Sequence, residues 1–182
     1  ETDARRFWAA MRDRLQEFSL SLHPEKTRLI RFGRFAADKR AQFGLGKPET
    51  FNFLGFTFIC GKSLKGKFLV MRRSRRDRVK AKLQEITEEL RQRRHDPIPE
   101  QGKWLRQVVG GFFAYHAVPT NFATLGTFNR RVMELWKRSL QRRSQRANLT
   151  WGRMQRLADD WLPKPKILHP WPGVRFAVRH SR

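Results

Sequence analysis

The stretch Phe51-Asn-Phe-Leu-Gly-Phe-Thr-Phe58 carries the clearest strand signal in this 182-residue chain. Its phenylalanines alternate with other residues in two phases, one before and one after Leu54-Gly55. The alternation predicts a strand over residues 51–59, and a glycine inside a strand often marks a bulge or the close approach of another backbone. Residues 61–66 form a basic turn, and the segment 67–71 (KFLVM) is predicted to return as the partner strand of an antiparallel hairpin.

The segment that precedes this hairpin is predicted to hold one helix and one further strand. Apolar residues recur at three- and four-residue steps over residues 3–20, which is typical of a helix with one apolar face. Residues 21–24 break that helix, and residues 27–32 (TRLIRF) then predict a strand. Residues 33–49 contain three glycines and a proline, so we expect a polar loop there.

The segment that follows the hairpin is helical in pattern. Residues 74–94 and 101–117 each carry apolar residues at helical spacing, and the second has the wider apolar stripe, so it is predicted to be the central helix. Asn121 and Thr150 are suited to cap a third and a fourth helix. The prolines after Trp161 indicate an extended tail, docked by its tryptophans.

The predicted fold class is therefore α+β, in three parts. Residues 1–71 form a small piece with a helix and an antiparallel hairpin, and residues 72–160 form an α-helical bundle. Residues 161–182 form a basic tail rich in proline and tryptophan. No internal repeat is visible in the sequence.

The charge of the chain narrows its possible functions. Lysine and arginine number 40 against 16 aspartates and glutamates, a formal net charge of +24. Such an imbalance destabilises a compact state through self-repulsion, and a polyanion relieves it by counterion release. Membrane-surface binding favours one basic amphipathic segment, whereas this charge is spread along the chain. Apolar residues make up 39%, enough for a core, so the chain is not a disordered basic tail. We therefore expect nucleic acid, and structured RNA in particular, as the partner.

Two further features bear on class and compartment. The single cysteine, Cys60, excludes an internal disulfide framework and any CxxC zinc site, and it fits a reducing compartment. No stretch approaches the roughly 20 apolar residues of a transmembrane helix, so we expect no membrane partner. The chain begins inside a helical pattern, so we expect it to be a fragment.

Several segments together resemble one known family. The blocks Leu20-Ser-Leu-His-Pro-Glu-Lys-Thr27 and "FNFLGFTF" resemble the last two conserved blocks of the reverse transcriptase palm, and most closely those of group II intron-encoded reverse transcriptase–maturases. The segments "PIPEQGKWLRQVVGGFFAYHAVP", "LWKRSLQRRSQR", "LTWGRM" and "WLPKPKILHPWP" look like the maturase-specific thumb, also called domain X. The resemblance covers essentially the whole chain and makes residues 1–71 the end of a palm and residues 72–160 a thumb.

The resemblance implies definite roles for four residues. Lys26 and Thr27 would lie near the incoming nucleotide's phosphates, and Leu54-Gly55 would belong to the primer grip. From the residues alone, Lys26 is better explained as a solvated turn lysine, and Leu54-Gly55 as part of a buried hairpin strand. The family's catalytic aspartates, in a Tyr-Ala-Asp-Asp hairpin, have no counterpart here. The chain is thus expected to bind no cofactor and to be inactive alone, although Mg²⁺ is expected for the full-length polymerase.

The basic faces of the first and third bundle helices hold the best candidates for RNA contacts. The alternative is a solvated helix face, but such a face normally interleaves glutamates. Glutamates do interleave in the middle of residues 74–94, so the basic ends of that helix are the better candidates. The predicted RNA-binding residues are Arg72, Arg73, Arg75, Arg76, Lys80, Arg93, Arg94, Arg130, Arg131, Lys137, Arg138, Arg142, Arg143 and Arg146.

Two other patterns are given structural interpretations. Asp159-Asp160, in the sequence Leu-Ala-Asp-Asp, mimics the polymerase motif, but it ends a helical pattern, and a two-metal site needs carboxylates clustered on a rigid support. We interpret it as a polar helix end. His116 lies in the central apolar helix and is expected to be a packed or hydrogen-bonded core histidine, because the five histidines show no metal-ligand spacing.

The leading hypothesis is the carboxyl-terminal part of a group II intron reverse transcriptase–maturase, in the bacterial cytoplasm. It would bind intron RNA and RNA/DNA template–primer duplex, together with the missing amino-terminal palm and fingers, and would assist splicing and RNA-templated DNA synthesis. One rival is a non-catalytic basic RNA-binding structural protein, which has no reason to carry the two palm-like blocks. Another is a fragment of a defence-associated reverse transcriptase.

Overall fold

The computed structural model describes residues 2–143 and 149–174, which divide into two compact units. The first unit ends at Glu49 and the second begins at Thr50. We expected the division after residue 71, but the hairpin strands pack with the helices that follow them. The observed class, helices with one antiparallel sheet, agrees with the predicted α+β class.

The first unit contains two helices, α1 (Thr2–Glu17) and α2 (Ala36–Gln42). The predicted helix over residues 3–20 is confirmed, but it ends three residues early and none of its residues is fully buried. Two aromatic side chains of its pattern, Phe7 and Phe18, are 68% and 61% exposed. An amphipathic helix normally covers its apolar stripe with a neighbour, and the first unit supplies little to cover it.

Two predictions for the first unit were wrong. Residues 27–32 form no strand, because no second strand lies beside them in this unit to pair with their backbone groups. The segment instead opens on a turn, in which the Thr27 amide donates to the His23 carbonyl at 2.9 Å. Residues 33–49 are not all loop, since α2 occupies their middle. Our prediction gave more weight to the flanking glycines than to the helix propensity of residues 36–42 (AADKRAQ).

The second unit opens with a three-stranded antiparallel sheet in the order β1 (Phe51–Phe53), β2 (Phe56–Lys62) and β3 (Phe68–Ser74). The predicted single strand over residues 51–59 is thus two strands joined by a two-residue turn. Leu54 and Gly55 both have positive φ, 45° and 76°, as the central pair of a type I′ turn requires. This turn explains the two phases of phenylalanine in the sequence, while the predicted return of residues 67–71 is confirmed in β3.

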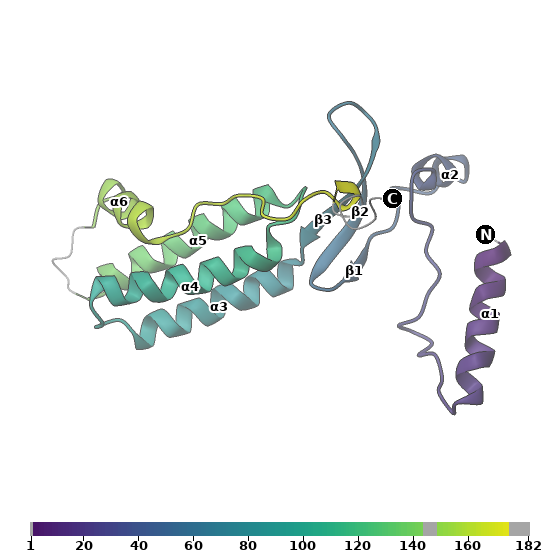
Figure 1. The fold of residues 1–182 in the computed structure, drawn as a ribbon, viewed down its shortest axis with the longest axis horizontal. Helices are drawn as coiled ribbons and strands as arrows, with labels where there is room; N and C mark the ends of the chain where they lie inside the picture. Colours follow the sequence, from purple (N-terminus) through teal and green to yellow (C-terminus); the bar gives the residue numbers. More distant parts are fainter. Residues whose placement is uncertain (1, 144–148, 175–182) are drawn as a thin grey trace. The chain divides into compact units, whose positions relative to one another are not determined.

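The helices α3 (Arg76–Gln92), α4 (Ile98–His116) and α5 (Phe122–Gln141) follow, and Figure 1 shows them running side by side. The shorter α6 (Trp151–Trp161) packs on α4 and α5. The predicted helices are confirmed, including the Thr150 cap, whose side chain accepts from the Arg153 amide. The helix α4 is central as expected, and Leu105 and Val109 are fully buried. Trp136 of α5 is also fully buried, and its indole donates to Gln101 Oε1 at 2.8 Å.

The carboxyl-terminal segment is described as far as residue 174, and it lies partly against α4. Backbone amides of Leu168 and His169 donate to the Ala117 carbonyl at 3.0 and 3.2 Å. Trp161, which ends α6, packs over the Cα of Gly102. Trp171 is 48% exposed. The segment is therefore held by backbone hydrogen bonds and by Trp161, and not by both tryptophans as we predicted. None of the helices described is long and apolar enough to span a bilayer.

Candidate nucleic-acid interface

Lys26 and Thr27 lie in the first unit, in the turn that follows α1. Their backbone amides both donate to the His23 carbonyl, at 3.3 and 2.9 Å. The Lys26 side chain is exposed and the Thr27 side chain is partly buried. The turn thus presents one lysine to solvent.

Leu54 and Gly55 lie in the second unit, at the tip of the β1–β2 turn. The Leu54 side chain is 67% exposed, and its carbonyl accepts a hydrogen bond from the Tyr115 hydroxyl at 2.7 Å. A Cβ on Gly55 would lie 3.6 Å from the Tyr115 ring. The close approach expected at this glycine is therefore made, in this structure, by a side chain of α4, and Leu54 is left facing solvent.

A buried polar junction holds the sheet against the helices. Ser74 Oγ lies 2.9 Å from His116 Nδ1, and Asn121 Nδ2 donates to Ser74 Oγ at 2.7 Å. His116 is 9% exposed and stacks on Phe112 at 4.2 Å, which confirms the expected core histidine. Burial lowers the pKa of His116.

The predicted cap at Asn121 is only half right. Asn121 stands at the amino end of α5, but its side chain makes no cap hydrogen bond. It accepts instead from the Ser74 amide, at 3.1 Å. The Asn121 side chain therefore bonds to the buried backbone of β3, although local propensity favours it as a cap of α5.

The carboxyl end of β3 and the start of α3 hold five of the predicted cations. Arg73, Arg76 and Lys80 are exposed, and no carboxylate of the described chain lies within ion-pair distance of them. Arg75 pairs with Asp77 at 2.6 Å, and this hydrogen bond lowers the pKa of Asp77. Burial lowers the pKa of Arg72, although an arginine stays protonated in proteins. Three of the five cations are therefore available to an external anion.

The other end of α3 is less available than predicted. Arg93 pairs with Glu89 at 3.2 Å and with Asp96 at 3.7 Å, and it also lies over the Trp104 ring. Arg94 is partly buried, and its Nε is enclosed without a hydrogen-bond partner among the described residues. The expectation that both ends of this helix present free cations therefore applies to its amino end only.

Three of the predicted cations on α5 contact other side chains of the protein. Arg130 and Arg131 both approach Glu134, at 4.0 and 2.8 Å. Lys137 lies over the Trp151 ring, 4.9 Å from its centre, a contact that a phosphate would have to share. These three predicted cations are engaged within the protein.

The remaining predicted cations lie in the last turn of α5 or follow it in the sequence. Arg138 and Arg142 are exposed, with no ion-pair partner in the described ranges 2–143 and 149–174. Arg143 is partly buried and donates to the Asp96 carbonyl. Arg146 lies outside the described residues. Arg73 lies on β3, Arg76 and Lys80 lie in the first turns of α3, and Arg138 and Arg142 lie at the carboxyl end of α5. Hydrogen bonds of Ser139 and Arg143 to the Leu90 and Asp96 carbonyls place this end of α5 beside the carboxyl end of α3. We call these five residues the unpaired cation set.

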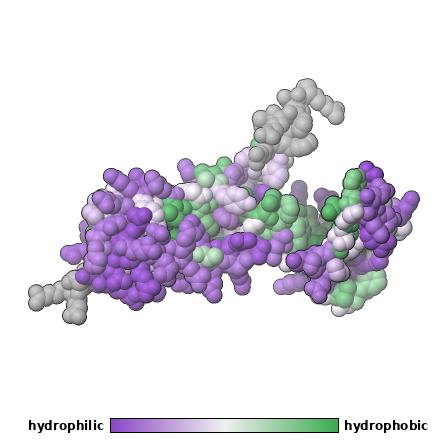
Figure 2. All heavy atoms as spheres, turned by 90° about the horizontal axis from the view of Figure 1, so that it is seen from below, coloured by the Kyte–Doolittle hydropathy of each residue, from purple (hydrophilic) through white to green (hydrophobic). Residues whose placement is uncertain are grey.

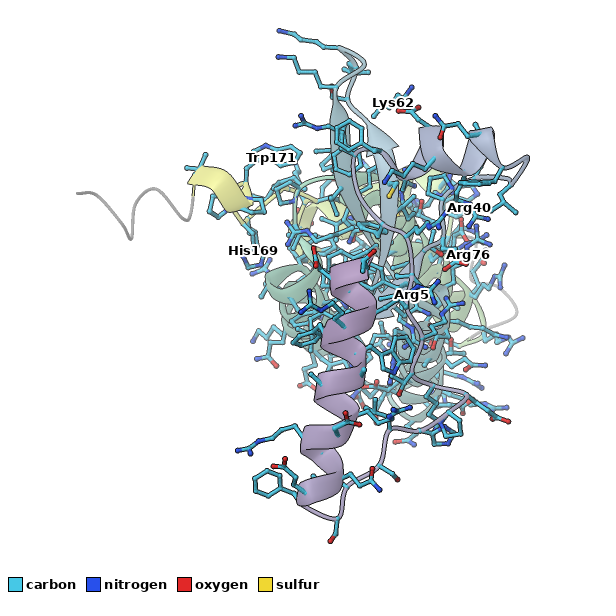
Figure 3. All side chains as sticks on the ribbon, turned by 90° about the vertical axis from the view of Figure 1, so that its right-hand side faces the viewer. Arg5, Arg40, Lys62, Arg76, His169 and Trp171 are labelled. Carbon is cyan, nitrogen blue, oxygen red and sulfur yellow. The ribbon has the colours of Figure 1, made fainter. Side chains whose placement is uncertain are left out.

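Some exposed cations were left out of our prediction. The β2–β3 turn carries Lys62, Lys65 and Lys67, all exposed, and none has an ion pair among the residues described. Figure 3 shows Lys62 and Arg76 on one side of the second unit, with His169 and Trp171 on the other. The turn was recognised as basic in the sequence, and its charge could have placed it among the candidates. In Figure 2 the visible face of the helical part is mostly hydrophilic.

The first unit also holds a cationic hollow that the sequence did not indicate. It has a volume of about 910 Å³ and lies between α1 and residues 29–39. Arg12, Arg34 and Lys39 line it beside the apolar surfaces of Trp8 and Leu29. Its residues lie in two segments that the sequence separates, so only their packing could bring them together.

The carboxylates of the described residues form no metal cluster. No group of three or more histidine, cysteine, aspartate or glutamate side chains lies close enough there to hold a metal ion. Asp159 and Asp160 lie in the last turn of α6, as the pattern predicted. Asp159 accepts from Gln155 Nε2 at 3.1 Å, and the Asp160 carbonyl accepts from Arg106. Asp159 thus bonds within α6, and the Asp160 backbone links α6 to α4.

Comparison of the chain with protein-family models returns no match. Comparison with curated proteins returns none either.

Proposed function

We propose that this chain is an RNA-binding carboxyl-terminal part of a group II intron reverse transcriptase–maturase. The observation that carries the nucleic-acid part is the unpaired cation set, five exposed cations on β3, α3 and α5 without carboxylate partners in the described structure. Together with a net charge of +24, it favours a phosphate backbone as the ligand.

The finer part of the proposal rests on the resemblance of the sequence blocks to the family. In that setting the chain grips intron RNA and template–primer duplex, while the missing palm and fingers supply the Mg²⁺-binding aspartates. The protein then acts in the bacterial cytoplasm and stabilises the folded intron, whose RNA performs the splicing chemistry. No step of polymerisation is assigned to residues of this chain.

A binding assay tests the nucleic-acid part. Fluorescence anisotropy measures the affinity of the full chain for a labelled RNA/DNA hybrid and for a structured RNA at several salt concentrations. We expect an affinity that falls steeply with salt, as phosphate contacts require. An affinity that does not change with salt would contradict the proposal.

A complementation assay tests the family assignment. The chain is mixed with a separately produced palm–fingers polypeptide of the same family and with intron RNA at low Mg²⁺. We expect faster splicing with both polypeptides than with either alone. The chain by itself should make no DNA on a primed RNA template, so synthesis by the chain alone would refute the assignment.

The alternative function is that of a basic RNA-binding structural protein. The same cation set supports it, but it predicts equal binding to intron RNA and to unrelated structured RNA of equal length. A preference for intron RNA at physiological salt separates the two hypotheses.

A further inference from the structure

The β2–β3 turn forms the tip of a projecting two-stranded ribbon. The strand β1 pairs only with residues 56–58 of β2, whereas β3 pairs with all of β2 as far as Lys62. The outer part of this hairpin therefore has no third strand beside it within the described chain, and Figure 1 shows the turn projecting beyond the rest of the sheet. The ribbon is thus free to contact a partner along its outer half.

The tip of the ribbon presents a leucine to solvent. Leu64 is 109% exposed, and the next most exposed large apolar residue in the described ranges, Phe7, is 68% exposed. A single exposed leucine is ordinary on a protein surface. Its meaning therefore depends on the turn that carries it and on the charges around it.

Hydrogen bonds fix the turn that carries Leu64. The Gly66 amide donates to the Ser63 carbonyl at 2.9 Å, and the Ser63 amide donates to the Lys67 carbonyl at 2.8 Å. The Lys67 amide donates to Ser63 Oγ at 3.2 Å, and Gly66 has a φ of 73°, which glycine adopts without strain. A ligand that contacts Leu64 therefore does not have to order the turn, which lowers the entropic cost of binding.

The segment around the tip is cationic throughout. Residues 50–76 contain seven lysines and arginines and no aspartate or glutamate. Lys62, Lys65 and Lys67 surround the tip and are exposed, without an ion pair in the part of the chain that the structure describes. From Lys67 to Arg73 the strand spans about 20 Å, at about 3.3 Å per residue. The tip and Arg73 of the unpaired cation set are therefore close enough to contact phosphates of one duplex.

The face of a base is the apolar surface that a nucleic acid offers to a leucine. Base faces are covered by stacking inside a continuous duplex, and opening a stacked step costs at least as much free energy as burying one leucine gains. A base face is already open where the duplex is interrupted, and RNA bulges and loops are common protein targets for this reason. The tip therefore fits an interruption of an RNA duplex better than its continuous part.

We propose that the β2–β3 turn packs Leu64 against the open face of a base at a bulge in double-stranded RNA, while Lys62, Lys65 and Lys67 contact the flanking phosphates. The inference rests on the proposed function, because it takes RNA as the ligand. It adds a structural preference to that function, since the chain then binds an interrupted duplex more tightly than a continuous one.

The test uses the full chain and two RNA duplexes that differ only by one bulged adenosine. We expect the bulged duplex to bind about tenfold more tightly in anisotropy titrations, as partial burial of a leucine implies. In NMR spectra the Leu64 methyl resonances, assigned by their absence in Leu64→Ala, should move upfield with the bulged duplex, because the ring current of a base shields groups on its face. Equal affinities for the two duplexes, or unmoved methyl resonances, would overturn the proposal.

Leucine variants locate the contact. Leu64→Ala should lose the preference for the bulged duplex, and its fold should be unaffected because the side chain packs on nothing. Leu64→Met should retain the preference, since methionine is also apolar and adapts to flat surfaces. Leu168→Ala, which removes a 46% exposed leucine of the carboxyl-terminal segment, is the matched control and should also retain it. A preference that persists in Leu64→Ala, or that is lost equally in Leu168→Ala, contradicts the proposed contact.

A lysine variant tests the phosphate contacts of the turn. Replacing Lys62, Lys65 and Lys67 together by alanine should weaken binding of both duplexes and make the salt slope less steep by about 2.7, as three phosphate contacts imply. The preference for the bulged duplex should remain, because Leu64 is retained. An unchanged slope would show that the turn contacts no phosphate and would overturn the proposal.

The failure of this proposal differs from the failure of the proposed function. If both duplexes bind equally and with a steep salt dependence, only the proposal for the turn falls. If neither duplex binds, or if binding does not depend on salt, the proposed function falls together with it.

Discussion

The strongest prediction concerns the unpaired cations at the end of β3 and the start of α3. Replacing Arg73, Arg76 and Lys80 together by alanine removes three exposed charges that have no carboxylate partner among the described residues. If each contacts one phosphate, the slope of log affinity against log salt should become less steep by about 2.7, because each contact contributes about 0.9 for a duplex. The salt dependence of binding therefore tests whether these unpaired cations contact phosphates.

The magnitude in affinity follows from the same slope. Over a fourfold rise in salt, from about 50 to about 200 mM, each contact changes log affinity by about 0.54. Three contacts give about 1.6 log units, so the unaltered chain should lose about 40-fold more affinity than the variant over this range. Anisotropy titrations against a labelled RNA/DNA hybrid at four or more salt concentrations measure this difference.

The matched control removes the same charge from paired residues. Arg91, Arg130 and Arg131 are exposed, and each lies near a glutamate, at 3.2, 4.0 and 2.8 Å respectively. Their triple alanine variant should change the slope by less, because each arginine already has an anionic neighbour. Equal slopes for the two variants would mean that net charge alone governs binding, and the argument from unpaired cations would be refuted.

The remaining predictions concern stability and are checked by denaturant titration. Gly102→Ala should destabilise the protein by about 1–3 kcal/mol, the usual cost of overpacking, because the new Cβ would lie 2.9 Å from Trp161 Cε3 and closer still to Cδ2. Gly111→Ala on the same helix should stabilise it by about 0.5–1 kcal/mol, since alanine is the better helix former; destabilisation by both would contradict the packing argument. Because burial lowers the pKa of His116, its contribution is fully present above the ordinary value of 6.5 and is lost as pH falls from there towards the lowered folded pKa. The stability difference between the unaltered chain and His116→Gln should therefore shrink below pH 6.5, and a constant difference from neutral to acid pH would refute this. Thr150→Ala should cost about 1 kcal/mol as a lost helix cap, and Thr150→Ser, which keeps the hydroxyl, should cost clearly less.

Charge composition predicts which helices carry the candidate site, and contacts within the folded chain decide which of their cations are available. The sequence identified the basic faces of the α3 and α5 helices, because arginine and lysine outnumber acidic residues there. It could not distinguish Arg76, which faces solvent without a partner, from Arg93, which pairs with Glu89 and Asp96. Which cations are available depends on which carboxylates lie across the chain's surface, and that is a property of the packed structure.

The sequence by itself determined the α+β class, the existence and order of the bundle helices, and the core position of His116. These follow from periodicity, and periodicity is local. Only the tertiary structure decided that Leu54-Gly55 is a turn held by Tyr115, that residues 27–32 are not a strand, and that Asn121 binds Ser74 rather than its own helix. Each of these depends on whether a hydrogen-bond partner from a distant part of the sequence is present or absent, and the spacing of residues along one segment carries no information about that partner.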